Sequence, residues 1–354
     1  MQPGRLSRQH RSSCRFHIAS VFKFWTMKVL LLVHHRFDLW KLPPWFGQRL
    51  AQQYPGLEIA QRDSYEGMEA ELRDAEVVFT ISLRPEQFAA ARLLRWLHTP
   101  SAAVHQMLFP ELINSSVILT NSREVHGPVV AEHVLALVFT LAKKIPQSVL
   151  LQQKRIWGQE TIWNQGQHPQ EIAGSTLGLI GVGSIGGRVA RTASRLGMRV
   201  IAVREHLEKG TPDGVEQVFP LSELDQLLSQ SDFVVIAAPL LAATERLISA
   251  DRLAHMKPSS YLINVGRGPQ VDQAALIEAL RTRQIAGAAL DVFDREPLPP
   301  DSPLWDQDNL LITPHTAGLT AKLWQRHYDL FSENLRRYTV GEPLLYLVDK
   351  HKGY

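Results

Sequence analysis

The fold is decided by the stretch TLGLIGVGSIGGRVARTASRL, residues 176–196. An apolar run typical of a buried strand leads into a G-x-G-x-x-G turn, and a helical pattern follows. The first glycine allows a tight turn, the second lets the backbone approach a pyrophosphate, and the third lets the helix pack on the strand. The N–H groups and dipole at the helix start favour a bound phosphate. A glycine turn that only packs the helix is the alternative, but the flanking elements favour a dinucleotide site comprising Gly181, Gly183, Ser184, Ile185 and Gly186.

The end of the next apolar run bears on the choice of dinucleotide. An NAD site usually has an acidic residue there, about 20 residues past the glycines, to bind the ribose 2′-OH. This chain has Arg204 at that point, followed by Glu205. A guanidinium pairs well with a 2′-phosphate, so the sequence favours NADP, with NAD as the second choice. In the alternative interpretation Arg204 is solvated and Glu205 takes the acidic role.

From Met27 onward, short apolar runs alternate with helical patterns. This alternation predicts an α/β fold with parallel sheets, built from two such units. One long helix is expected over about residues 126–152 and a last one over 319–338. The predicted strands are 29–34, 57–60, 77–81, 94–98 and 117–121 in the first unit, and 176–180, 199–203, 233–237, 261–265, 286–291 and 310–313 in the second.

The basic character of the 354-residue chain comes from its first 26 residues, which contain five basic residues and no acidic one. Leaving those five out reduces 38 basic residues to 33, against 35 acidic ones, so the net charge falls from +3 to −2. This argues against a nucleic-acid partner. Residues 1–26 resemble an organellar transit peptide in composition. We favour an upstream start, with Met27 as initiator, and expect this leader to stand outside the fold.

The cysteine and histidine content argues against several kinds of site. The only cysteine is Cys14, in the leader, which excludes disulfides, Cys-ligated zinc and a Cys nucleophile from the body. This agrees with a cytoplasmic location. The spacing of His126 and His133 is wrong for a pair of helical ligands, so we expect no metal. No apolar run approaches the ~18 residues of a membrane span, so no membrane partner is expected.

Three further segments carry a family signature. They are NVGRG at 264–268, ALDVFDREP at 289–297 and TPHTAG at 313–318, and NSREVHGP at 121–128 and APL at 238–240 add to them. Together with the glycine motif, they resemble the D-isomer-specific 2-hydroxyacid dehydrogenases. The resemblance covers about residues 76–340 and extends more loosely from Met27. It implies oxidation and reduction between a 2-keto acid and a D-2-hydroxy acid by hydride transfer.

The chemistry of that reaction suggests a role for each of three residues. The planar fork of Arg267 suits a carboxylate and can polarise the adjacent carbonyl. His315 titrates near neutral pH and suits a proton donor to the oxygen on which charge develops. Glu296 beside it would favour the imidazolium and fix the tautomer. The resemblance implies the same catalytic roles for Arg267, Glu296 and His315, whereas each taken singly reads as an ordinary loop residue.

The resemblance also implies further contacts. Asp291 would lie near the nicotinamide carboxamide, and Pro239, Val265 and Gly318 would line the cofactor. The segment 101–104 resembles the loop whose backbone N–H groups hold the substrate carboxylate. Alanine stands at 103, where the family often has glycine, which narrows the pocket or weakens this assignment. The expected substrate-binding residues are therefore Ala102, Ala103, Val104, Arg267 and His315.

By resemblance, the architecture consists of two Rossmann-like domains with the active site in the cleft between them. Residues 27–124 and 316–354 would form the substrate (catalytic) domain, and residues 125–315 the dinucleotide-binding domain. The helix from His126 would support a homodimer. The tryptophans Trp157, Trp163 and Trp305 could shape a pocket or an interface, but core packing is the favoured use.

The sequence favours an NADPH-dependent reductase of 2-keto acids similar to glyoxylate or hydroxypyruvate. The alternative class is a dinucleotide-regulated binding protein of the co-repressor type, which shares the fold and the catalytic trio. The chain ends soon after its last helix, without the long C-terminal extension of those proteins, and this favours the enzyme. Formate or phosphite oxidation on the same scaffold is a further alternative, although no signature for it is recognisable.

Overall fold

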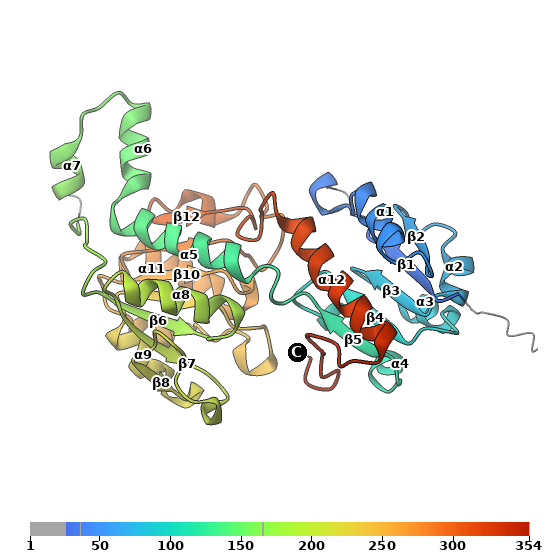
Figure 1. Cartoon of the computed structure of the whole chain (residues 1–354). Helices are drawn as coiled ribbons and strands as arrows, with labels where there is room; N and C mark the ends of the chain where they lie inside the picture. The colour runs from blue at the N-terminus through green and yellow to red at the C-terminus, as the bar shows by residue number, and fades with distance from the viewer. Residues whose placement is uncertain (1–25, 36, 165, 354) are drawn as a thin grey trace, which may run out of the picture.

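The computed structural model describes residues 26–35, 37–164 and 166–353. The predicted leader therefore lies outside the described residues, apart from Thr26. The described chain forms two lobes, each built on a parallel sheet (Figure 1). The predicted α/β class with parallel sheets is confirmed.

The first lobe contains a five-stranded sheet in the order β2-β1-β3-β4-β5. Its strands are β1 (Lys28–Leu32), β2 (Glu58–Arg62), β3 (Val77–Thr80), β4 (Trp96–Thr99) and β5 (Ile118–Asn121). The helices between them are α1 (Pro44–Gln53), α2 (Glu69–Asp74), α3 (Pro85–Ala90) and α4 (Pro110–Ile113).

The second lobe contains a seven-stranded sheet in the order β12-β11-β10-β9-β6-β7-β8. Its strands are β6 (Thr176–Ile180), β7 (Arg199–Val203), β8 (Gln217–Phe219), β9 (Phe233–Ile236), β10 (Tyr261–Asn264), β11 (Gly287–Leu290) and β12 (Leu310–Ile312). Its helices are α8 (Ser184–Arg195), α9 (Leu224–Gln230), α10 (Ala250–Ala254) and α11 (Gln273–Arg281).

Both faces of the second sheet are buried. On β6, Leu177 and Leu179 join a core cluster with α5 (Gly127–Ala142) and α8, whereas Ile180 joins the cluster on the opposite face with α9. A parallel sheet covered on both faces explains why its strands read as continuous apolar runs such as Phe233–Ile236. The strand order reverses beside β6, where β9 and β7 flank it, and ligands bind at such a switch point.

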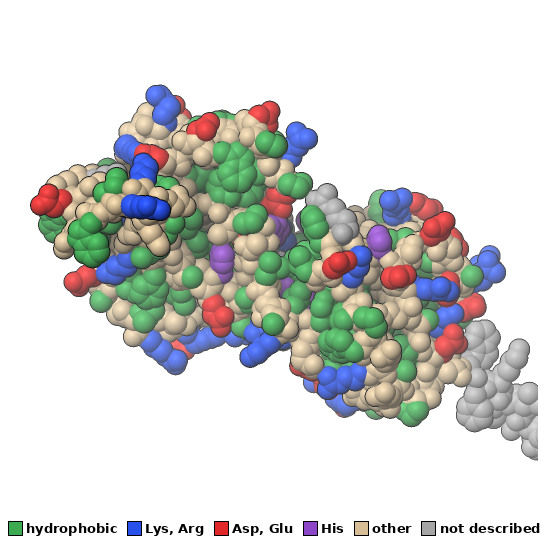
Figure 2. All heavy atoms as spheres, turned by 90° about the horizontal axis from the view of Figure 1, so that it is seen from above, with side chains coloured by type: hydrophobic (Ala, Val, Ile, Leu, Met, Phe, Trp, Pro, Cys, Tyr) green, Lys and Arg blue, Asp and Glu red, His purple; other side chains and the backbone are tan. Residues whose placement is uncertain are grey.

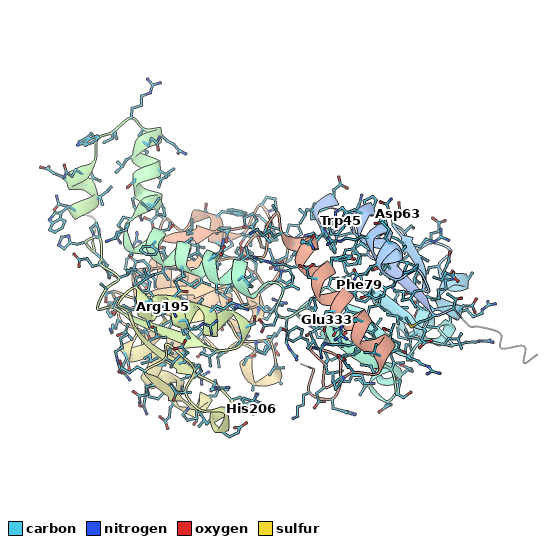
Figure 3. All side chains as sticks on the ribbon, in the orientation of Figure 1. Trp45, Asp63, Phe79, Arg195, His206 and Glu333 are labelled. Atoms are coloured by element: carbon cyan, nitrogen blue, oxygen red, sulfur yellow. The ribbon has the colours of Figure 1, made fainter. Side chains whose placement is uncertain are left out.

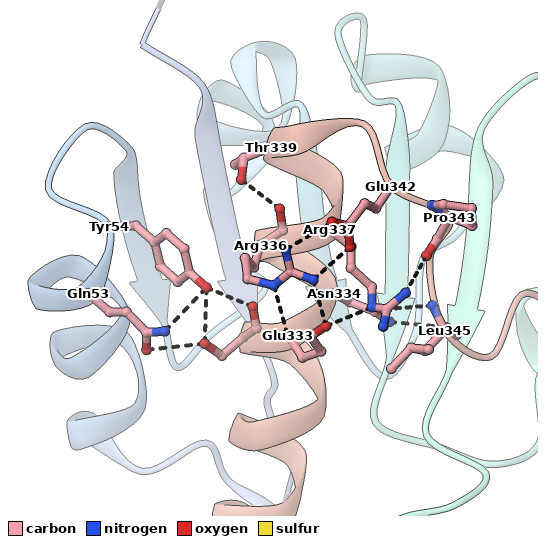
Figure 4. A network of polar contacts seen from close by, with 11 residues as sticks. Gln53, Tyr54, Glu333, Asn334, Arg336, Arg337, Thr339, Glu342, Pro343 and Leu345 are labelled. Atoms are coloured by element: carbon pink, nitrogen blue, oxygen red, sulfur yellow. Dashed lines mark hydrogen bonds and ion pairs between the residues drawn. The ribbon is translucent and has the colours of Figure 1, made fainter.

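The last helix, α12 (Leu323–Val340), returns to the first lobe. Phe331 packs edge-on against Phe79 of β3 at 4.9 Å between ring centroids, and Figure 3 labels Phe79 next to α12. The Tyr54 hydroxyl, after α1, donates to the Ser332 carbonyl at 2.8 Å. Arg336 bonds both Glu333 and Glu342, at 3.0 and 2.7 Å, which closes the end of the helix (Figure 4).

The single long helix expected over 126–152 is wrong. The chain instead forms α5 and α6 (Ile145–Gln153), which meet at a 66° bend. Lys144 between them has a left-handed φ of 56°, and Pro146 begins the next turn. Proline has no N–H to donate and clashes with the carbonyl of residue i−4, so the first helix stops before it.

Two smaller differences concern the edges of the elements. The strand β8 at the sheet edge was not expected, because its three residues follow polar positions and are too few to show the two-residue alternation of a strand. The last helix starts at Leu323 rather than 319. Within the described residues, no single helix has the length and apolarity to cross a membrane, although the bent pair α5 and α6 passes that test by composition.

Candidate active site

His315 and Glu296 form a close pair at the carboxyl end of the second sheet. His315 follows β12, and its Nδ1 lies 2.6 Å from Oε2 of Glu296. The other carboxylate oxygen of Glu296 accepts from the Phe293 amide at 3.0 Å. The second ring nitrogen of His315, Nε2, therefore stays available for a substrate, because Nδ1 is committed to the carboxylate.

The charges of this pair support each other. The hydrogen bond to Glu296 raises the pKa of His315 above its ordinary value, although burial opposes the shift. Burial acts to raise the pKa of Glu296, but the hydrogen bonds from His315 and the Phe293 amide outweigh it and the pKa is lowered. Both shifts favour an imidazolium facing a carboxylate.

Arg267 lies on the loop after β10, and that loop is held from several sides. The Asn264 side chain donates to the Arg267 carbonyl at 3.0 Å, and the Arg267 amide donates to Oε1 of Gln270 at 2.8 Å. A Cβ on Gly268 would lie 2.0 Å from the Phe293 carbonyl carbon, so only glycine lets this loop approach the segment that bonds Glu296. Burial lowers the pKa of Arg267, and the negative charge of Glu296 opposes this shift. The Arg267 guanidinium therefore interacts electrostatically with the Glu296 carboxylate.

Asp291 positions the loop that carries His315. Its buried carboxylate accepts from the Thr313 hydroxyl at 2.6 Å and from the amides of Thr316 and Ala317 at 2.9 and 3.0 Å. His133 on α5 lies 3.2 Å from the same hydroxyl. The Asp291 carboxylate thus braces the loop that follows β12, and the sequence analysis did not predict this role.

The glycine turn has the shape that a dinucleotide needs. Gly181 has a φ of 95°, and its amide donates to the Val203 carbonyl at 3.0 Å. A Cβ on Gly186 would lie 2.0 Å from the Gly181 carbonyl oxygen, so α8 packs directly on the turn. A Cβ on Gly183 would have no atom within 4 Å, so open space adjoins the start of α8. The residues present therefore fit a pyrophosphate on the helix N-terminus.

The other residues predicted to bind the cofactor differ in which of their groups could reach it. The Ser184 hydroxyl is buried without a partner and faces Gly127 of α5, so only the backbone of Ser184 is directed to the turn. Ile185 packs against the core. Arg204 directly follows β7, and its guanidinium donates to the Gly210 carbonyl at 3.0 Å, whereas Glu205 is exposed.

The other predicted contacts lie around the same region. The Pro239 carbonyl accepts from Gln270, and Gly318 lies against His126 at the start of α5. Val265 is buried in the core. On the first lobe, Ala102 is exposed and Ala103 is half-buried. The Ala102 carbonyl accepts a hydrogen bond from the Asn121 side chain at 2.8 Å. The Val104 side chain lies in the first-lobe core, so only the backbone of Val104 could contact a ligand.

A cavity of about 640 Å³ opens beside the pair, and the sequence interpretation did not find it. It combines first-lobe residues with second-lobe residues, and Figure 2 shows hydrophobic side chains on both lobes where they meet. Trp305 lines it with half of its surface exposed, so the expected core packing of Trp305 is wrong. The same correction holds for Trp157 and Trp163, which are 93% and 57% exposed.

A buried histidine network in the first lobe reaches the start of α5, and it was also missed. His98 of β4 and His327 of α12 both contact the Ser122 hydroxyl, at 3.1 and 3.2 Å. His327 packs against His126 at 5.5 Å between ring centroids. Burial lowers the pKa of His98 to about 3, so this ring stays neutral. Within the described ranges, no group of three or more His, Cys, Asp or Glu side chains could hold a metal.

Comparison with known proteins assigns this site to a family. The sequence model of the D-isomer specific 2-hydroxyacid dehydrogenase NAD binding domain matches residues 135–317, more than half of the chain. The chain belongs to the D-isomer specific 2-hydroxyacid dehydrogenase family. It is therefore an NAD(P)-dependent oxidoreductase that acts between 2-keto and 2-hydroxy acids.

Individual relatives agree with this membership. A glyoxylate reductase of Thermofilum pendens is 34% identical over 286 residues, which cover 79% of this chain and 83% of that protein. A family member from Xanthobacter autotrophicus, solved with NADPH, is 31% identical, covers 92% and 99% of the two chains and has a TM-score of 0.74. The NADPH-dependent glyoxylate/hydroxypyruvate reductase of Sinorhizobium meliloti, solved with NADP, is 26% identical over 93% and 100%, with a TM-score of 0.77.

Proposed function

We propose that this dehydrogenase reduces 2-keto acids to D-2-hydroxy acids with NADPH, and that Arg267, Glu296 and His315 are its catalytic residues. The observation that carries the proposal is the 2.6 Å contact between Nδ1 of His315 and the Glu296 carboxylate. This contact leaves one proton-donating nitrogen directed away from the pair. Glyoxylate and hydroxypyruvate, for which relatives are named, are the first substrates to assay.

Each residue has a role that follows from its surroundings. The turn from Gly181 to Gly186 would hold a dinucleotide, whose reduced nicotinamide would supply the hydride for the keto carbon. Arg267 would bind the substrate carboxylate and polarise the carbonyl, since its guanidinium is held on a braced loop close to Glu296. The imidazolium of His315 donates its Nε2 proton to the carbonyl oxygen as charge develops there, and Glu296 stabilises the charged ring. In the oxidative direction the neutral ring takes the proton back.

The substrate carboxylate needs a second anchor, and we assign it to the loop of Ala102, Ala103 and Val104. The Ala102 carbonyl is already tied to Asn121, which leaves the backbone N–H groups as the donors that an anion requires. The cofactor would lie along Gly181, Gly183, Ser184, Ile185 and Gly186 and extend past Pro239 and Val265 towards Asp291 and Gly318.

The central test is the variant His315→Ala. Turnover should fall by about 10²–10⁴-fold, because the general acid is lost. Cofactor binding, followed by NADPH fluorescence, should persist, since the glycine turn lies on a different loop. The product of hydroxypyruvate reduction should be D-glycerate. Near-normal turnover in this variant would remove His315 from the mechanism.

The preference for NADPH rests on Arg204. The strand β7 ends at Val203, so Arg204 occupies the position next to the glycine turn, where a 2′-phosphate would lie. A charge-assisted hydrogen bond to that phosphate contributes about 1.5–3 kcal/mol. The native chain should use NADPH with higher kcat/KM than NADH, and Arg204→Asp should lose this preference. A native preference for NADH would assign the ribose to Glu205 instead.

We propose that the protein is a homodimer. The segment from the end of α5 through α7 (Gln159–Asn164) projects from the second lobe (Figure 1) and exposes large apolar side chains. They are Phe139, Ile145, Val149, Leu150, Ile156, Trp157 and Trp163. Apolar surface concentrated on one projecting segment is typical of a subunit interface, and a second copy is the occupant that we propose because two-fold homodimers are the commonest oligomers. The expected cytoplasmic location stays a prediction that cell fractionation tests.

A further inference from the structure

The cavity beside His315 collects an unusual share of exposed apolar surface. Phe37, Leu39, Trp305 and Leu319 all line it, and their side chains are 48%, 46%, 51% and 38% exposed. Single exposed apolar residues are common on soluble proteins, whereas several around one concave site indicate a binding surface. The exposed surface of this cavity is therefore suited to bind an apolar group of a ligand.

Both lobes hold these walls in fixed positions. On the first lobe, the Trp324 indole of α12 donates to the Leu39 carbonyl at 3.1 Å, which fixes η1 (Asp38–Trp40). On the second lobe, the Trp305 indole donates to the Pro299 carbonyl at 2.9 Å, which fixes the ring at the end of η7 (Pro303–Asp306). The apolar walls are thus braced by hydrogen bonds to neighbouring elements.

Polar residues are the minority of the described cavity lining. Glu296 and His315 lie in its lining, together with Thr316 and His35, and the other described lining residues are apolar. No Lys or Arg is among the described lining residues. A ligand whose carbonyl oxygen meets His315 would therefore place the rest of its side chain against Trp40, Leu298, Trp305, Ile312 and Leu319.

The size and apolar lining of the cavity favour some candidate substrates over others. Glyoxylate has a hydrogen in place of a side chain and would leave these walls in contact with water. The hydroxymethyl group of hydroxypyruvate would bring a hydroxyl next to apolar walls, where it loses hydrogen bonds to water. A branched aliphatic or aromatic side chain would instead remove the apolar surface from water.

We propose that the preferred substrates of this enzyme are 2-keto acids with a large apolar side chain, branched aliphatic or aromatic, which the cavity between η1 and η7 receives. The inference rests on the proposed function and specifies its substrate class. Trp305, Leu39 and Leu319 are then specificity-determining residues.

The test compares kcat/KM at saturating NADPH for glyoxylate, hydroxypyruvate, 4-methyl-2-oxopentanoate and phenylpyruvate. We expect at least one of the two apolar substrates to exceed glyoxylate by about 10-fold or more, since one methylene in an apolar pocket discriminates by about 10–200-fold. A preference for glyoxylate or hydroxypyruvate overturns the substrate class and leaves the proposed function intact. Absence of turnover with all four overturns the proposed function itself.

Variants then locate the preference in the cavity. In Trp305→Ala, the ratio of kcat/KM for phenylpyruvate to that for glyoxylate should fall about 10-fold, and Trp305→Phe should restore most of it. Trp45→Ala is the matched control, because Trp45 is 37% exposed on α1 and does not line the cavity. Leu39→Ser gives a second reading if Trp305→Ala fails to fold. Unchanged ratios in folded Trp305→Ala and Leu39→Ser overturn the assignment.

Discussion

At the scale of single residues, neighbouring groups decide the charge of His315, the proposed proton donor. Its contact with Glu296 raises the pKa of His315, and the amide of Phe293 keeps that carboxylate charged. These residues come from different loops, after β11 and after β12. The pKa of His315 is therefore a property of the pair and not of the histidine alone.

This pairing predicts a pH dependence. Reduction needs the imidazolium, so kcat/KM for keto-acid reduction should fall as the pH rises through the pKa of His315. In Glu296→Gln the raising hydrogen bond and charge are lost while burial, which lowers the pKa, stays. The midpoint of the fall should move to lower pH, as pH–rate profiles of both proteins would measure. An identical midpoint in the variant would separate Glu296 from the titration.

The residue scale also shows what sequence patterns detect. Arg267, Glu296 and His315 stand in motifs with fixed order, so a family resemblance can point to them. Trp305 and Leu39 stand in no motif, and only their exposure around one cavity indicates a role. An isolated tryptophan is most often a core residue, and for Trp305 this expectation failed because its side chain lines a cavity that first-lobe residues also line.

At the scale of elements, the contact between α5 and α8 links the two lobes to the cofactor turn. Gly127, in the first turn of α5, lies so close to α8 that a Cβ there would be 2.2 Å from the Ser184 hydroxyl and 2.9 Å from Nε of Arg188. Arg188 in turn bonds Glu124, which precedes α5, at 2.9 Å. The start of α8 is therefore held in place by the helix that leaves the first lobe.

This contact predicts a stability coupling. Gly127→Ala should lower the free energy of unfolding by about 1–3 kcal/mol through overpacking. Ser184→Ala removes a buried hydroxyl that has no partner and should cost little. The double variant should recover part of the loss, because the closest clashing atom is gone, and urea unfolding would measure the cycle. Strict additivity of the two changes would contradict direct packing.

Element boundaries show where local patterns mislead. The strands β6 and β7 fall on the predicted residues, because each is a buried apolar run closed by a turn. The run over 126–152 is apolar throughout, so its period alone could not reveal the break at Lys144. Pro146 was the available signal, since proline ends a helix that precedes it.

At the scale of the whole molecule, the exposed apolar segment from α5 through α7 predicts the oligomeric state. Light scattering after size exclusion should give about twice 39.9 kDa for the chain. The double variant Leu150→Asp with Trp157→Asp should shift the mass towards one copy, because it places charges in the apolar contact. Leu93→Asp is the control, as Leu93 is 37% exposed but lies after α3 on the first lobe. A native monomer would contradict the proposal.

The fold class of the molecule could be predicted from the amino-acid sequence alone. Alternating apolar runs and helical patterns specify an α/β fold, and the glycines at 181, 183 and 186 specify the turn, because both depend on neighbours along the chain. The family motifs further located Glu296 and His315, the proposed catalytic pair, in the sequence. These features are local, so each is legible in a window of a few residues.

The contacts between segments that are distant in the sequence became visible only in the folded chain. Leu39 and Trp40 are separated from Phe293 by more than 250 positions, yet they line one cavity with it. His98, Ser122 and His327 join across β4, β5 and α12, and Asp291 turns inward to brace the loop of His315. No local pattern encodes such contacts, because they depend on how α5 and α12 carry the chain between the lobes.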